Sequence, residues 1–449
     1  MKGSAKFLLA ALIAGVCMRM VLLWLAAIGD GVLSHSDQGA YIQLAEYLNA
    51  GGNFGPGFGS ERLPVYPLFL SFCFQLADFL GLAAHKLVFA ASIQNAFGLL
   101  IVPIMYAAGR VFSRDAANLA AGFAALNMNM AVYSNQILTE ALFYPVFAFG
   151  ILSMIRYKAG GETMRIAVAA LVFGFCTLIR PVTMYLPLFM IPYLLIERSA
   201  GSWKKNGLHA VIFGIVFMAA VAPWLSRNHA LYGHAELTNQ GVPHIVGWVL
   251  PAVSRQEQGK DISTAMRDES RKWSEYEKDL PEEVRENPMS LSKEAKRYGA
   301  RRLMDSSPAA VAKAWFWGAV KNLFAPVAVE LAYILQMDWT HFYETPGNSA
   351  WEQGMNFIFK NENKVYSFML AAGIFLTLAF RLVQLAGAWV LARKRPGVLV
   401  FSVIMIGYFL AVSGPVGYAK YRLPYEPVFV LLTALAVERF TGGRKDEEQ

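Results

Sequence analysis

Apolar segments long enough to cross a lipid bilayer recur along this chain, and they constrain its fold more than any other feature. Phe7–Ile28, Leu87–Ala108 and Tyr366–Leu391 each approach or exceed the roughly 20 apolar residues that a transmembrane helix needs. Hydrophobic residues make up 56% of the 449 residues, and charged residues make up only 16%. This balance excludes an ordinary soluble protein. The sequence therefore predicts an all-α polytopic membrane protein, a transmembrane helix bundle with about ten spans.

Basic residues at the ends of the apolar segments predict the orientation of the chain. Lys2 and Lys6 precede the first segment, and Arg393, Lys394 and Arg395 follow a later one, as expected on the cytoplasmic side. Both termini are therefore predicted to be cytoplasmic. The net charge of +8 is explained by this orientation signal, so no nucleic-acid partner is expected.

Changes in composition divide the chain into three parts. Residues 1–226 form an N-terminal transmembrane module that includes an external loop one at 30–62. Residues 227–365 form an external charged helical insertion with a juxtamembrane segment, and residues 366–449 supply further spans and a cytoplasmic tail. Whether 63–81 and 309–335 cross the membrane stays open, because prolines and charges interrupt both segments; we expect both at the outer face. The chain shows no repeat of fixed period, a pattern that does not favour an inverted-repeat transporter.

Ionisable residues collect on the predicted outer face of the membrane. Charged side chains at membrane depth are costly and usually face a cavity. A carboxylate can take the proton of an attacking hydroxyl group, while Arg or Lys holds a phosphate that leaves. We therefore take two acids, Asp37 and Glu140, as catalytic candidates. The substrate-binding candidates are Glu61, Arg62, Tyr66, Arg180, Arg227, Asn228, Lys420 and Arg422.

Structural explanations exist for several of these residues. Asp37 could cap the amphipathic helix that the pattern of 37–49 predicts. Glu61 and Arg62 could form a surface ion pair of small energetic value. Arg227 and Lys420 could anchor the chain at the membrane interface.

Five short segments of the chain, in order, resemble a known family. They are DxxxYxxxAxxL followed by RxPxYPLFL within Asp37–Leu70, LTEALF at 138–143, LIRPVTMYLPL at 178–188, PWLSRNHALYG at 223–233 and YRLPYEP at 421–427. Together they resemble the polyprenyl-phosphate-dependent glycosyltransferases of the GT-C superfamily. The similarity is greatest to bacterial relatives of dolichyl-phosphate-mannose protein mannosyltransferases and of the aminoarabinose transferase that modifies lipid A.

The resemblance implies a GT-C type helix bundle with juxtamembrane helices in loop one, placed in the bacterial inner (plasma) membrane. By position, Asp37 matches the acid of loop one that acts as base or orients the acceptor, and Glu140 matches a second outer acid. Arg180, Arg227 and the Lys420–Arg422 turn fall where phosphate and sugar contacts are expected. One departure is that Gln38 follows Asp37, where protein mannosyltransferases carry a second acid. A protein Ser or Thr as acceptor is therefore less favoured.

The expected function is that of an inverting glycosyltransferase, for a hexose or a pentose, with its active site facing the periplasm. Its partners would be the lipid bilayer, a sugar donor on polyprenyl or undecaprenyl phosphate, and a glycan, lipid or protein acceptor, with the chain acting as a monomer or an oligomer of unknown size. The three Cys and seven His residues lack ligand spacing, so no metal site is predicted, although a divalent metal is not excluded. The alternatives are a transporter or flippase of a lipid-linked or small solute, and a non-catalytic scaffold.

Overall fold

The computed structural model describes residues 2–28, 37–196, 201–342, 344–347 and 349–442. Most of these residues are in helices. The first part of loop one, residues 29–36, lies outside this description. The described residues contain no strand, so the expected all-α class is confirmed. In chain order the α-helices are α1 Lys2–Ile28, α2 Gln38–Asn49, α3 Val65–Phe79, α4 Lys86–Leu99, α5 Ile101–Gly109, α6 Arg114–Ala125, α7 Met128–Ser134, α8 Glu140–Gly160, α9 Thr163–Ile179, α10 Pro187–Ile196, α11 Trp203–Tyr232, α12 Leu250–Gln258, α13 Ile262–Lys278, α14 Glu282–Glu286, α15 Pro288–Asp305, α16 Pro308–Phe324, α17 Ala328–Ile334, α18 Ala350–Phe359, α19 Lys364–Lys394, α20 Pro396–Ser413 and α21 Glu426–Gly442.

Five helical segments in the described part of the chain are long and apolar enough to span a membrane. They are Ala5–Ile28 of α1, Ala83–Gly109 across α4 and α5, α11, α19 and α20. Many large apolar side chains on α1, α11 and α19 are exposed, such as Leu9, Ile215 and Phe375, which suits contact with lipid tails. Shorter apolar helices add to the bundle, but the expected total of about ten spans stays a prediction.

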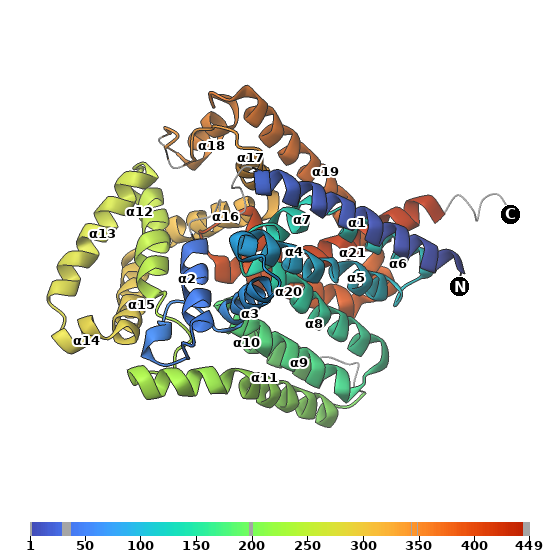
Figure 1. Cartoon of the computed structure of the whole chain (residues 1–449), viewed down its shortest axis with the longest axis horizontal. Coiled ribbons are helices and arrows are strands. Elements are labelled where there is room, and N and C mark those ends of the chain that lie inside the picture. The colour runs from blue at the N-terminus through green and yellow to red at the C-terminus, as the bar shows by residue number, and fades with distance from the viewer. Residues whose placement is uncertain (1, 29–36, 197–200, 343, 348, 443–449) are drawn as a thin grey trace.

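The helix α8 lies near the middle of the bundle and is buried along most of its length (Figure 1). Phe143 and Phe147 stack on each other, and Phe147 also contacts Phe173 of α9 and Phe409 of α20. The helix α6 buries a stripe of alanines that lets α1 and α5 approach closely. The stretch after α6 does not continue as one helix, because Asn127 accepts a hydrogen bond from the backbone of Met130 and starts α7.

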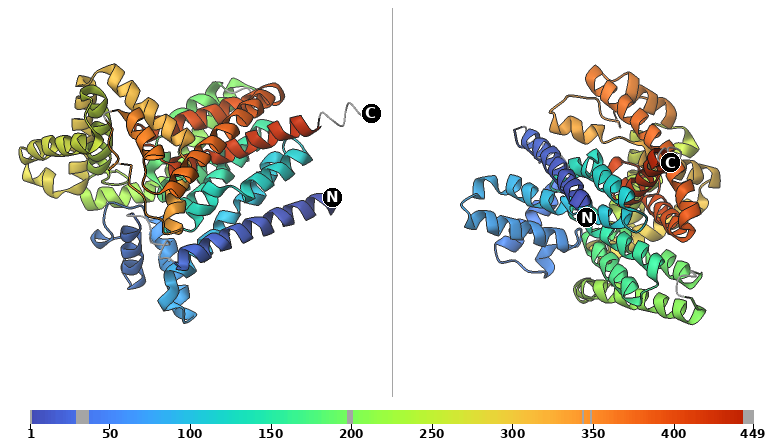
Figure 2. Two further views of the ribbon diagram at one scale, coloured as in Figure 1. Left: turned by 90° about the horizontal axis from the view of Figure 1, so that it is seen from above. Right: turned by 90° about the vertical axis from the view of Figure 1, so that its right-hand side faces the viewer.

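The start of α1 and the end of α21 lie at the same end of the bundle (Figures 1 and 2). Termini on one side of a membrane require this arrangement, although the side itself stays a prediction. At the opposite end, the short helical segment Val242–Val249 and α12 to α15 form a layer with its own small core (Figure 2). This core consists of Val246, Leu250, Trp273, Ala295 and Tyr298. The division of the chain at residues 226 and 365 also stays a prediction.

The two segments whose crossing was left open form short helices. The helix α3 has 15 residues and α16 has 17, so neither reaches the length of the five candidate spans. Both contact elements at the end away from the termini: α3 packs on α2, and α16 packs on α12 and on the short helix Ala419–Arg422. These two helices therefore form part of the surroundings of the candidate site.

Candidate active site

Asp37 lies immediately before α2, and its carboxylate is directed toward two cations. One oxygen accepts a hydrogen bond from Nη2 of Arg62 at 3.2 Å, and the other lies 3.5 Å from Nζ of Lys420. Asp37 makes no side-chain capping hydrogen bond to α2. The carboxylate is 41% exposed, so a ligand can reach it. The structure therefore favours an electrostatic role for Asp37 over helix capping.

Loop one brings Arg62 back over the start of α2. Gly59 turns the loop with a φ of 85°, a conformation that residues with a Cβ rarely adopt. The Arg62 guanidinium then lies 5.1 Å from the ring centroid of Tyr41, and Tyr41 packs edge-on against Tyr66. Arg62 is therefore held by an aromatic face on one side and by Asp37 on the other.

Tyr66 joins loop one to the segment that carries Glu140. Its hydroxyl donates to Oε1 of Gln94 on α4 at 3.0 Å. The amide nitrogen of Gln94 in turn donates to the backbone carbonyls of Ser134 at 2.8 Å and Gln136 at 2.5 Å. All four polar groups are buried, so this network fixes the path of the chain that leads into α8.

Glu140 and Arg180 form a buried ion pair next to this network. Glu140 begins α8 and is 4% exposed at its side chain, and Thr139 donates to its Oε2 at 3.0 Å. Arg180 ends α9 in an extended conformation, as the following Pro181 requires, and this turns its guanidinium toward Glu140. A buried acid and base of this kind must remain paired, because either charge alone would be expensive to bury.

The two groups of charges form one cluster, which we define as Asp37, Arg62, Glu140, Arg180 and Lys420. Four of its members act electrostatically on the Tyr41 hydroxyl. Burial alone would lower the pKa of Lys420, but nearby Tyr421, Glu140 and Asp37 raise it above its usual value. The cluster therefore holds three cations and two carboxylates, an arrangement that suits a phosphate ligand beside a proton acceptor.

Arg227 and Asn228 lie outside this cluster; Arg227 holds loop one in place, and Asn228 holds the segment that follows α11. Arg227 donates to the carbonyl of Phe54 at 2.7 Å and to that of Gly55 at 2.9 Å, and its guanidinium lies 4.5 Å from the ring centroid of Trp224. Asn228 donates to the carbonyl of Glu236 at 2.6 Å. In each of these hydrogen bonds, the side chain of Arg227 or Asn228 donates to a backbone carbonyl. The structure therefore gives both residues a positioning role.

Two further candidates also lie apart from the cluster. Arg422 is buried, pairs with Glu426 at 2.7 Å and donates to the carbonyl of Ala325 at 2.9 Å. These bonds fasten the turn before α21 to the end of α16. The Glu61 side chain is exposed, and only its backbone carbonyl accepts a long bond, from Gln240 at 3.5 Å.

Gln94 and Glu330 were not among the residues selected from the sequence. Both are polar side chains inside mainly apolar segments, and such residues usually have a structural or functional partner. That signal is present in the sequence for each of them. The partners, however, come from distant segments, which only the fold brings together.

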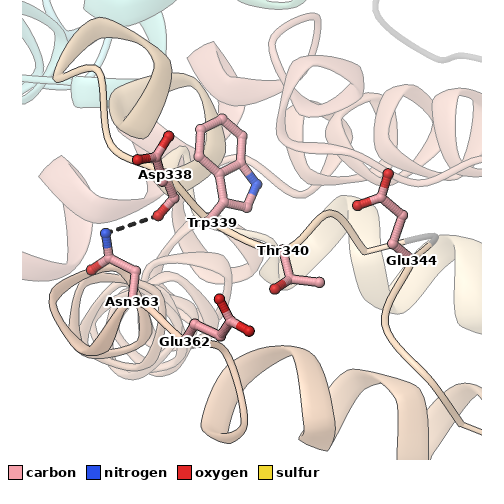
Figure 3. Close-up of a pocket in the computed structure, with 6 residues that line it drawn as sticks. All are labelled: Asp338, Trp339, Thr340, Glu344, Glu362 and Asn363. Carbon is pink, nitrogen blue, oxygen red and sulfur yellow. Dashed lines mark hydrogen bonds between the residues drawn. The ribbon is translucent and has the colours of Figure 1, made fainter.

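A separate acidic cavity lies between α17 and α19, and Figure 3 shows its lining. Its volume is about 390 Å³, and its lining residues are Asp338, Trp339, Thr340, Glu344, Glu362 and Asn363. Asn363 donates to the backbone carbonyl of Asp338 at 2.8 Å, which joins the two walls. No grouping of three or more His, Cys, Asp or Glu side chains that could hold a metal ion occurs in the described part of the chain.

The long apolar helices and the charged cluster at one end of the bundle define an all-α, polytopic membrane protein. Residues 61–226 match the model of a family described as dolichyl-phosphate-mannose-protein mannosyltransferase. The family resemblance predicted from the sequence is therefore confirmed. The matched residues include Arg62, Glu140 and Arg180 of the cluster.

One solved structure shows that the chain has the GT-C type of fold. The chain is similar to the archaeal oligosaccharyltransferase AglB from Archaeoglobus fulgidus in complex with an inhibitory peptide and a dolichol-phosphate, with a TM-score of 0.53 and 13% identity. The similarity covers 97% of this chain and 50% of that chain, so this chain spans about half the length of AglB. A weaker likeness, to ArnT from Cupriavidus metallidurans bound to undecaprenyl phosphate, has a TM-score of 0.37 and 15% identity, over 95% of this chain and 77% of that chain. No curated protein sequence matches the chain.

Proposed function

We propose that this protein is an inverting GT-C glycosyltransferase that moves a sugar from a polyprenyl-phosphate donor to an acceptor hydroxyl group. The observation that carries the proposal is the position of Asp37 between Arg62 and Lys420, beside the buried pair of Glu140 and Arg180. A reaction of this kind needs cations for the phosphate and a carboxylate for the proton. The family match over residues 61–226 supports the same reaction class.

In the proposed reaction, the acceptor oxygen attacks the anomeric carbon, and the bond from that carbon to the phosphate oxygen breaks. The electron pair of the broken bond leaves with polyprenyl phosphate, and the proton of the acceptor hydroxyl passes to the Asp37 carboxylate. One displacement at one carbon inverts its configuration. Arg180, held in direction by Glu140, and Lys420 stabilise the leaving phosphate.

Donor binding would also change the partners of Asp37. In this structure both of its oxygens face cations, at 3.2 and 3.5 Å. The bound donor is a phosphodiester with one negative charge, so it competes with the Asp37 carboxylate for Arg62 and Lys420 on roughly equal terms. As the bond to the anomeric carbon breaks, the leaving phosphate monoester gains a second negative charge and a third unesterified oxygen, so it attracts these two cations more strongly than the carboxylate does. Asp37 is therefore expected to accept the proton as the donor bond breaks.

The membrane setting belongs to the same proposal. The helix α2, which Asp37 immediately precedes, lies at the end of the bundle away from the start of α1 and the end of α21 (Figure 1). With cytoplasmic termini in the bacterial inner membrane, this end faces the periplasm. The sugar can be a hexose or a pentose, the carrier is undecaprenyl or another polyprenyl phosphate, and the acceptor is a glycan, a lipid or a protein.

The proposal is tested with purified protein in lipid nanodiscs and radiolabelled polyprenyl-phosphate hexoses and pentoses. We expect label to move to a hydroxyl acceptor, with inverted anomeric configuration by NMR. Lys420→Met removes one contact to the phosphate, worth roughly 1.5–3 kcal/mol, and is expected to raise the donor KM by about 10- to 100-fold. Lys313→Met, at an exposed position of α16, is the matched control. Absence of transfer from every donor would instead favour the transporter or flippase.

A further inference from the structure

Glu330 is a buried acid that the proposed reaction does not use. It lies on the short helix α17, which is not one of the candidate spans, and it is 1% exposed. Its Oε1 accepts a hydrogen bond from the Tyr133 hydroxyl at 2.6 Å. Its Oε2 is buried and has no hydrogen-bond partner. Among the residues that the structure describes, no Lys or Arg forms an ion pair with it.

The position of Glu330 connects two segments that supply members of the charged cluster. Tyr133 is on α7, seven positions before Glu140 in the sequence. Tyr418, on the other side, also acts on the Glu330 carboxyl and precedes Lys420 by two positions. A change at Glu330 is therefore transmitted both to the start of α8 and to the turn that carries Lys420.

We infer that Glu330 is a positioning residue that is protonated at neutral pH, and that its uncharged carboxyl group keeps the neighbouring cluster attractive to phosphate. This inference rests on the proposed function. An ionised carboxylate with one oxygen buried and unpaired would be costly, whereas a neutral carboxyl group avoids that cost. Loss of the proton would add a third carboxylate near a cluster that already has two, and would leave it without excess positive charge.

The surroundings of Glu330 agree with this protonation state. Burial raises the pKa of Glu330, while the hydroxyl groups of Tyr133 and Tyr418 and the charge of Lys420 oppose that effect. The other titratable groups facing it are Tyr333 on its own helix and Tyr366 on α19. The pKa values of Tyr133 and Tyr418 are raised by burial and by Glu330 itself. These tyrosines therefore stay neutral while Glu330 titrates.

Infrared difference spectroscopy of the full-length protein in nanodiscs tests the protonation state without any substrate. We expect wild type at neutral pH to show the C=O stretching band of a protonated carboxyl group, and Glu330→Gln to lack that band. Glu362→Gln, which changes an exposed acid just before α19, should keep the C=O band. A spectrum of Glu330→Gln that is identical to wild type in this region would overturn the inference.

The donor KM as a function of pH tests the positioning role. In wild type the KM should rise as alkaline pH ionises Glu330, because the new carboxylate competes with the phosphate for Lys420. Glu330→Gln should keep transfer within about threefold of wild type at neutral pH and abolish that rise. Tyr133→Phe, which removes the hydrogen bond to Oε1, should change the same pH profile.

The two measurements separate this inference from the proposed function. A band lost in Glu330→Gln, in a protein that transfers no sugar, refutes the proposed function and leaves the protonation state standing. Transfer by wild type, together with more than about tenfold loss in Glu330→Gln at neutral pH, shows that a negative charge is needed at this position. That result overturns the inference.

Discussion

Replacing Asp37 by Asn is expected to stop sugar transfer and leave the fold intact. Its carboxylate is 41% exposed, and each of its two ion pairs, with Arg62 and Lys420, belongs to a class that contributes roughly 0–1 kcal/mol to stability. A general base contributes about 10²- to 10⁴-fold to the rate, or about 3–5 kcal/mol of transition-state stabilisation. The effect on the reaction is therefore larger than the effect on stability.

The assay measures two quantities for each variant in the same nanodiscs: the initial rate of label transfer at saturating donor, and the midpoint of thermal unfolding. For Asp37→Asn, we expect kcat to fall by at least about 100-fold. The donor KM should not rise, because Arg62 and Lys420 lose a competing carboxylate. Such a separation of kcat from KM is what a residue that acts on the acceptor proton should show.

Glu46→Gln provides the matched control on the same helix. Glu46 pairs with Lys86 at 2.7 Å and is 49% exposed, so removing its charge breaks a comparable ion pair outside the cluster. We expect its rate to equal that of wild type. If Asp37→Asn keeps a rate within about threefold of wild type, the assignment of Asp37 as base is refuted, and Glu140 becomes the next acid to test. Equal losses in both variants would show that the effect comes from the stability of α2.

Two further outcomes follow from positions outside the cluster. Arg227→Lys keeps the positive charge but cannot reproduce the forked guanidinium that binds the carbonyls of Phe54 and Gly55. Loop one should therefore become more sensitive to limited proteolysis, and the rate of sugar transfer should fall by roughly tenfold. Unchanged proteolysis would contradict the positioning role of Arg227. Burial, aided by Arg255, lowers the pKa of Lys321 to about 8 from 10.5 in an unfolded chain. Between pH 8 and pH 10.5 the unfolded chain binds more protons than the folded protein, so the midpoint of thermal unfolding should rise with pH above about 8. Lys321→Met should remove that rise. Equal slopes of the midpoint against pH in wild type and variant would show that Lys321 is not responsible.

The membrane fold could be predicted because its main signal is local in the sequence. The apolar segments Phe7–Ile28 and Leu87–Ala108 correspond to the spans Ala5–Ile28 and Ala83–Gly109. The membership of the charged cluster was partly predictable for a different reason. Once the orientation is assigned from Lys and Arg, polar residues at the outer ends of spans are expected to share one surface. Arg62, Arg180 and Lys420 do so.

The partner of each cation could not be read from the sequence. Arg180 follows the last residue of α9 and Arg227 lies in the last turns of α11, yet Arg180 pairs with a carboxylate and Arg227 binds backbone carbonyls. The difference depends on the path of loop one, which brings the carbonyls of Phe54 and Gly55 within hydrogen-bond distance of Arg227. Gly51 and Gly59 both adopt a positive φ in this loop, and no local pattern specifies which of its glycines do so.

The charge state of the buried acid Glu330 also could not be read from the sequence, because it depends on partners from distant segments. Glu330 interrupts an apolar segment, and sequence alone would assign it a negative charge at neutral pH. Its surroundings come from α7, α17 and the turn before α21, which are separated by many residues in the sequence. Burial by these three segments favours the neutral form, since Glu330 has a hydroxyl group beside it and no ion-pairing cation among the described residues. The electrostatic balance of the cluster is therefore a property of the assembled fold, and a variant such as Glu330→Gln measures that balance more directly than any change within the cluster itself.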